Sequence, residues 1–152
     1  MNEVIEKNSM EMSLSEIRRA ICGDMVFTLV IDPAKKIEMR MKELDQATMN
    51  GIDNEIFKRN IDPQKNYKEY DNAIKVLKLA TAYIDLYIDG KVILMKNEAD
   101  MVVTEPNDKI HAVEALLRTL GEGVISGLAV QYDNIIIEKF ANVQKKTILK
   151  AE

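Results

Sequence analysis

The chain has 152 residues, of which 47% are apolar and 30% are charged, and this composition excludes an intrinsically disordered protein and indicates one globular domain. The formal net charge of −4 argues against polyanionic partners such as nucleic acid or an anionic membrane surface. Cys22 is the only cysteine, which excludes an intramolecular disulfide framework and a zinc site built from several cysteines.

The first predicted helix begins at Ser13, because Ser13 and Glu16 form a capping-box pattern. It ends near Cys22, before a glycine. The next segment, 24–32, is rich in β-branched and apolar residues. It is compatible with a buried strand or with a continued helix, since a short apolar run has no diagnostic period. Residues 1–12 are expected to form a flexible leader.

A second helix is predicted from Pro33 to about Met49. Asp32 followed by proline is a favourable helix start, because the aspartate caps an amide and proline loses no hydrogen bond in the first turn. The apolar residues that follow recur at steps of three and four, and they are Ile37, Met41, Leu44 and Thr48. A further short turn of helix is expected within 52–59.

The third predicted helix begins near Pro63 and is well supported as far as Ala82. It carries two adjacent apolar stripes, which together form a wide apolar face. Beyond Ala82 the sequence favours an antiparallel hairpin, because 84–88 alternates apolar and polar residues and an Asp-Gly pair follows. A helix continuing to Ile88 remains the alternative. A third strand within 101–104 is also compatible with the pattern.

The last two predicted helices span Asp108–Leu120 and Val124 to about residue 145, joined by a short glycine-rich turn. Residues 146–152 are expected to be a flexible tail, which leaves 13–145 as the single domain. The predicted fold class is helix-dominated α+β, with about five helices and a small antiparallel element near residues 83–104. An all-α helical bundle is the alternative.

Three polar residues in the fourth predicted helix have the spacing of metal ligands. Asp108, His111 and Glu114 recur every three residues and would lie on one helix face. Metal sites in bundles usually take Glu-x-x-His from two helices, whereas His111 is the only histidine. A solvated first turn explains the acids better, because the helix dipole favours them there. We therefore predict no metal and no cofactor, and keep these residues only as candidate ligands.

The sequence contains no convincing catalytic set. Cys22 is more simply read as a small apolar residue at a helix end than as a nucleophile. No serine lies in a nucleophile-elbow pattern, and the glycine-rich turn at 121–123 follows a helix rather than the strand that a phosphate-binding loop requires. These observations favour a protein that is not an enzyme.

Tyrosine and methionine are the residue types that point most clearly to a function. Four of the five tyrosines lie in one stretch, and tyrosine suits contact surfaces because a polar tip ends a large apolar body. Methionine is used on adaptable binding faces. The predicted interaction residues are Tyr67, Tyr70, Tyr83, Tyr87, Met39 and Met41. We predict a non-catalytic protein–protein interaction module (an assembly, adaptor or inhibitory factor) that forms a homo-oligomer through 67–88.

Two other functions remain open. One is a small-ligand or metal-binding protein, or an enzyme, with a pocket near His111. The other is nucleic-acid binding through the basic C-terminal residues Lys145, Lys146 and Lys150. The N-terminal residues lack the pattern of a secretory signal, and no apolar run approaches the ~18 residues that a membrane span requires. A cytoplasmic protein without a membrane partner is therefore expected.

Overall fold

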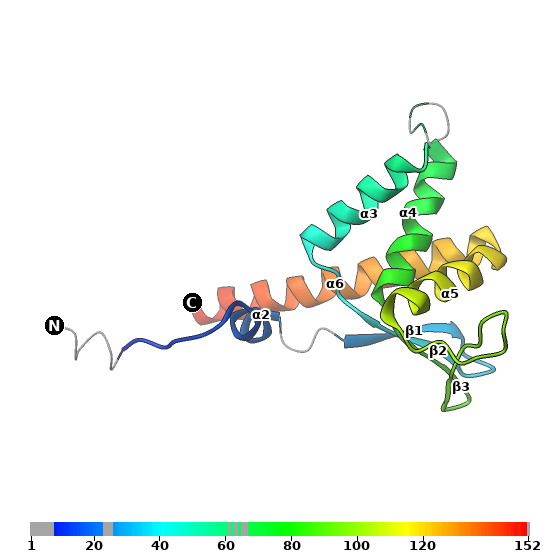
Figure 1. Cartoon of the computed structure of the whole chain (residues 1–152). Helices are drawn as coiled ribbons and strands as arrows, with labels where there is room; N and C mark the ends of the chain where they lie inside the picture. The colour runs from blue at the N-terminus through cyan, green and yellow to red at the C-terminus, as the bar shows by residue number, and fades with distance from the viewer. Residues whose placement is uncertain (1–7, 23–25, 61, 63, 65–66, 152) are drawn as a thin grey trace.

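The computed structural model describes residues 8–22, 26–60, 62, 64 and 67–151, without the side chains of Cys22 and of 140–151. Within these residues five helices and one four-stranded antiparallel sheet occur, which confirms the helix-dominated α+β class and excludes the all-α bundle. The elements, in chain order, are α2 (Leu14–Cys22), β1 (Val26–Asp32), β2 (Ile37–Lys42), α3 (Gln46–Lys58), α4 (Tyr67–Ala82), β3 (Tyr83–Ile88), β4 (Lys91–Ile93), α5 (Pro106–Thr119) and α6 (Glu122–Ala151) (Figure 1).

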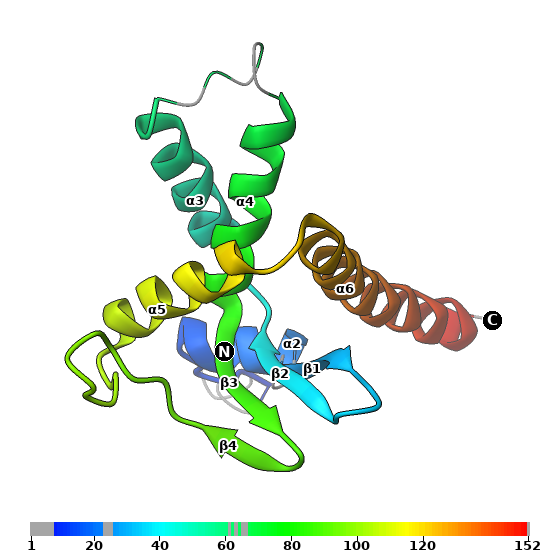
Figure 2. The same cartoon turned by 90° about the vertical axis from the view of Figure 1, so that its right-hand side faces the viewer.

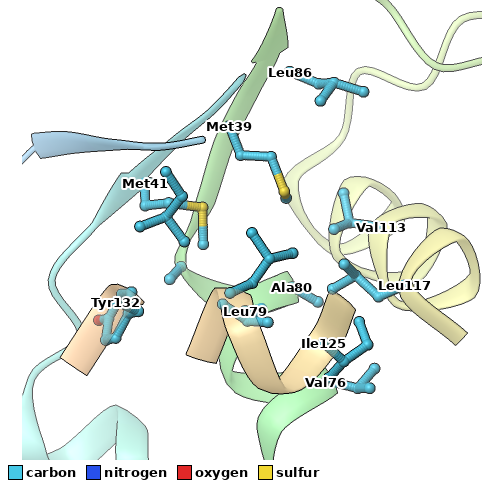
Figure 3. Packing of buried hydrophobic residues seen from close by; sticks show 13 residues of the cluster. Met39, Met41, Val76, Leu79, Ala80, Leu86, Val113, Leu117, Ile125 and Tyr132 are labelled. Atoms are coloured by element: carbon cyan, nitrogen blue, oxygen red, sulfur yellow. The ribbon is translucent and has the colours of Figure 1, made fainter. Parts of the chain in front are cut away.

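The sheet has the strand order β1-β2-β3-β4, and helices α3 and α4 connect its two hairpins (Figure 2). Leu29, Met39 and Leu86 lie opposite one another in neighbouring strands, so their side chains share one face. That face packs against α4, α5 and α6 and forms the core (Figure 3). The opposite face carries polar side chains such as Glu38 and Arg40, which explains why the strands alternate in burial.

The helix predicted from Pro33 to Met49 is wrong, because this segment closes one hairpin and forms its second strand. The Asp32 side chain accepts hydrogen bonds from the amides of Ala34 and Lys35, at 3.0 and 3.3 Å, and so stabilises a turn. Lys36 then adopts a φ of 53°, which a helix does not allow. The helix start lies later, at Asp45, whose carboxylate accepts a 2.7 Å hydrogen bond from the Thr48 amide.

Several local predictions are confirmed. Ser13 caps α2 by accepting from the Glu16 amide at 3.2 Å, and it also donates to the Glu16 carboxylate at 3.1 Å. Of the two structures that the sequence allowed for 24–32, strand and helix, its described part forms the strand β1. The hairpin after Ala82 is present, and its turn residues Asp89 and Gly90 have φ values of 52° and 78°, as a type I′ turn requires. The third strand considered within 101–104 is only an isolated bridge.

Helix α4 lies at the centre of the fold, and its wide apolar face is covered by its own chain. The face buries five side chains, namely Val76, Leu77, Leu79, Ala80 and Ala82. Leu77 packs with Ile52 and Ile56 of α3, and the others join the main core formed with α5, α6 and the sheet. The face is indeed too wide for one neighbour, but three helices of the same chain cover it. This removes the reason for expecting an exposed apolar surface at 67–88.

Helix α6 lies beside the edge strand β1 and then continues away from the sheet (Figure 2). The Gln131 side chain accepts from the Val30 amide at 2.7 Å and donates to the Val30 carbonyl at 3.1 Å, as a neighbouring strand would. This pair of bonds protects a sheet edge that is otherwise a template for aggregation. The backbone remains helical to Ala151, with no boundary near residue 145.

Candidate interaction surface

Helix α2 presents an apolar stripe that is open to solvent. Leu14, Ile17 and Ile21 follow one another at steps of three and four, so they lie on one helix face. Their exposed fractions are 85%, 40% and 73%, and every described residue from Asn8 to Ile21 is exposed. Leu14, Ile17 and Ile21 therefore join neither of the two buried apolar clusters, to which each of the other four described helices contributes.

The length of α2 makes this exposure significant. The helix has nine residues. Isolated helices shorter than ~12–15 residues are marginal in water, because nucleation is costly and few hydrogen bonds offset it. The Ser13 cap contributes ~1 kcal/mol, which does not change that balance. A helix of this size normally gains its stability by packing an amphipathic face against another surface.

A groove of about 770 Å³ lies between α5 and the segment from Met95 to Glu105. The segment is a small hairpin: the Asn97 side chain accepts from the amides of Ala99 and Met101, at 2.9 and 3.0 Å. On the α5 side, the lining residues recur at steps of three and four over three turns, and they are Asp108, His111, Ala112, Ala115, Leu116 and Thr119.

The groove combines apolar side chains in its lining with exposed acidic side chains at its rim. The apolar lining includes small residues of α5 and flexible side chains of the hairpin, such as Met95 and Met101. Three carboxylates, Glu98, Glu105 and Asp108, line the rim together with one ammonium, from Lys96. Lys96 pairs with Asp100 at 3.5 Å, outside the groove lining. The rim therefore favours a partner that combines apolar side chains with positive charge.

Of the three candidate metal ligands, Glu114 is held by arginines. Its carboxylate accepts from Arg59 and from Arg118, both at 2.7 Å, and its side chain is 10% exposed. Burial by itself raises the pKa of Glu114, but the hydrogen bonds and the charges of both arginines outweigh it, so the pKa lies below its ordinary value. Glu114 is therefore a structural ion-pair residue that ties α5 to the end of α3.

His111 and Asp108 are both exposed and lie on the rim of the groove. His111 also borders a second cavity of about 400 Å³, between α3, α4 and α5. No group of three histidine, cysteine or acidic side chains with metal-binding geometry occurs in the part of the chain that the structure describes. The 3-residue spacing of the candidate ligands thus places them on one side of α5 without bringing them to a common point.

The predicted interaction residues do not form one surface. Tyr67 is exposed near the start of α4, whereas the Tyr70 hydroxyl donates to Asp53 of α3. Tyr83 is half-buried beside the core, and this burial raises its pKa to about 12. Tyr87 lies on the polar face of the sheet. Four neighbouring tyrosines are separated in this way because the chain changes from helix to strand between them.

Met39 and Met41 lie in the core instead of on a binding face. Both point inward from β2, and their exposed fractions are 1% and 0% (Figure 3). The basic residues Lys145, Lys146 and Lys150 belong to the α6 backbone, and their side chains lie outside the described part. Sequence reasoning missed the α2 stripe as a contact surface, although its signal, three apolar residues after a capping box, is present in the sequence.

Comparisons of this chain with protein-family models, with curated proteins and with solved structures each found no match. Among the described residues, no helix combines the length and the apolar character needed to cross a membrane.

Proposed function

We propose that this chain is a non-catalytic protein–protein interaction module that self-associates, with α2 as its docking helix. The open stripe of Leu14, Ile17 and Ile21 on a nine-residue helix is the observation that supports this proposal. Such a helix gains stability only when the stripe is covered, so free energy is available for docking. Compared with the sequence-based prediction, the proposed contact surface moves from 67–88 to α2.

The proposal predicts that polar substitution of the stripe abolishes self-association. In the variant Leu14→Gln, Ile17→Gln, Ile21→Gln, glutamine preserves helix propensity and removes the apolar surface. Because covering each aliphatic side chain contributes roughly 1.5–3 kcal/mol, we expect the dissociation constant to rise at least ~100-fold. Sedimentation equilibrium between ~1 and ~200 μM measures it.

The matched control is Val130→Gln, which replaces an aliphatic residue that is 57% exposed on α6 and should leave self-association unchanged. Hydrogen exchange adds a local readout, because the amides of 14–22 should become protected as the wild-type concentration rises. A wild-type protein that stays monomeric throughout this range would contradict the proposal.

A small-ligand site in the groove beside His111 is the second candidate function. The observation that favours it is the size of the groove, about 770 Å³, together with the apolar side chains in its lining. Native mass spectrometry of protein purified under mild conditions separates the two functions. A stoichiometric small-molecule adduct that is absent from Ala115→Arg would support a ligand site, whereas a protein dimer without an adduct supports the docking module.

A further inference from the structure

We infer that the groove between α5 and the 95–105 segment receives α2 from a second copy of this chain. This inference rests on the proposed function and identifies the surface on which α2 docks. Each copy would give one helix and receive one, so the pair closes with two-fold symmetry and contains two identical contacts.

The dimensions of the groove suit the helix. The lining residues on α5 run from Asp108 to Thr119, which at ~1.5 Å per residue is about 16 Å of helix. From Leu14 to Cys22, α2 spans about 12 Å by the same measure. Ala112 and Ala115 are small, so a second helix can approach α5 closely, and the thioethers of the hairpin can adapt to aliphatic side chains.

The charges of the two surfaces are complementary. Arg18 and Arg19 follow Ile17 directly on α2, and Glu16 is the only acid in that helix. The groove rim has three carboxylates against one ammonium. Among the described residues, Glu98, Glu105 and Asp108 form no ion pair. Their carboxylates can therefore accept hydrogen bonds from an arginine of α2 in the second copy.

Another apolar depression has more cations at its rim than the groove has. It measures about 520 Å³ and lies between the end of α3 and the starts of α4 and α6. Its rim carries three cations, from Arg59, Lys68 and Arg118, and two carboxylates, from Glu69 and Glu122. Arg59 and Arg118 already pair with Glu114, so this depression adds the Lys68 ammonium and two carboxylates, whereas the groove has three carboxylates and one ammonium. Arg18, which borders the apolar stripe of α2, therefore favours the acidic groove as the docking site.

The position of α2 in the chain indicates that a second copy supplies the helix. Figure 1 shows α2 on one side of the molecule, and the loop beside α5 on the other. Within one copy, Arg18 lies on the side of Asp45, the N-cap residue of α3. The pKa of the Asp45 carboxyl is lowered mainly by its hydrogen bonds with Thr48 and, to a smaller extent, by the positive charge of Arg18.

A mixing experiment on the full chain tests the inference. One variant lacks the stripe (Leu14→Gln, Ile17→Gln, Ile21→Gln), and the other has a blocked groove (Ala115→Arg, an exposed helical position). Each variant by itself should be monomeric where the wild type is dimeric. An equimolar mixture should contain a heterodimer, because the first variant keeps its groove and the second keeps its helix. If one variant carries a tag that increases its mass, light scattering distinguishes the heterodimer from either homodimer. Val130→Arg is the control for the effect of an added arginine.

A charge exchange provides a second test with exposed residues only. Arg18→Glu and Asp108→Arg should each raise the dissociation constant about tenfold, and the combined variant should recover most of the wild-type affinity. A wild-type dimer that needs α2 but is unaffected by Ala115→Arg would overturn the groove as the docking site and leave the proposed function standing. A mixture of the stripe and groove variants that stays monomeric would also overturn the inference, whereas a monomeric wild type would count against the proposed function itself.

Discussion

Truncation of Tyr132 to alanine is expected to lower the free energy of unfolding by about 4 kcal/mol, which would make it the most destabilising single substitution considered for this protein. The Tyr132 side chain is 1% exposed and lies in the core (Figure 3). Its ring lies 5.2 Å from that of Phe27 and beneath the ammonium of Lys78. Its hydroxyl donates to the Lys42 carbonyl at 3.2 Å and accepts from the Leu44 amide at 2.9 Å. One side chain thus joins α6 to the end of β2.

The variant Tyr132→Phe separates the hydroxyl from the ring. We expect a loss of about 1–2 kcal/mol, because the Leu44 amide loses its acceptor in a partly buried site. Urea unfolding followed by circular dichroism measures both variants. A phenylalanine variant as stable as the wild type would show that the two hydroxyl hydrogen bonds contribute little.

The same tyrosine gives an expected pH dependence. Burial raises the pKa of Tyr132, and it raises that of Tyr83 to about 12. The unfolded chain then loses these protons first, near pH 10, so stability should be complete below that pH and fall as the pH rises above it. In Tyr132→Phe, the free energy of unfolding should fall less steeply as the pH rises above that value.

Removal of the Glu114 carboxylate is the second substitution with a large expected effect. Glu114→Ala leaves Arg59 and Arg118 without their shared partner and separates α5 from the end of α3. We expect a loss of about 2–3 kcal/mol, which is less than for a fully buried pair because both arginines are partly exposed. Thermal and urea unfolding measure the change.

Acid provides a second readout of the same ion pairs. The pKa of Glu114 is lower in the folded than in the unfolded chain. Its contribution to the free energy of unfolding is therefore complete above pH ~4.5 and is lost as the pH falls through the folded pKa. Glu114→Gln should therefore flatten the acid side of the stability curve. The control is the partly exposed ion pair between Lys75 and Asp71, which lie one turn apart on the same helix, and Asp71→Asn should change stability by less than ~0.5 kcal/mol.

The sequence by itself was sufficient to predict the elements whose geometry depends only on neighbouring residues. The capping pattern at Ser13, the periodic apolar face of α4 and the Asp89-Gly90 turn each follow from local geometry, and the structure has all three. The same reasoning failed at 33–49. An Asp-Pro pair starts either a turn or a helix. The apolar residues of β2 alternate as in a strand, but Ile37 and Met41 also fit a helical spacing that continues to Leu44. β2 became a strand because it pairs with both β1 and β3, and β3 is distant in sequence.

The candidate site depended still more on tertiary structure. The apolar stripe of α2 and that of α4 are both readable in the sequence, but packing decides which of them is covered. Helices α3, α5 and α6 cover α4 and leave the stripe of α2 open, a choice made by contacts between distant segments. The pairing of Glu114 with Arg59, 55 residues apart, converted a candidate metal ligand into a structural ion pair for the same reason. Local propensity acts over a few residues, whereas exposure depends on the whole folded chain.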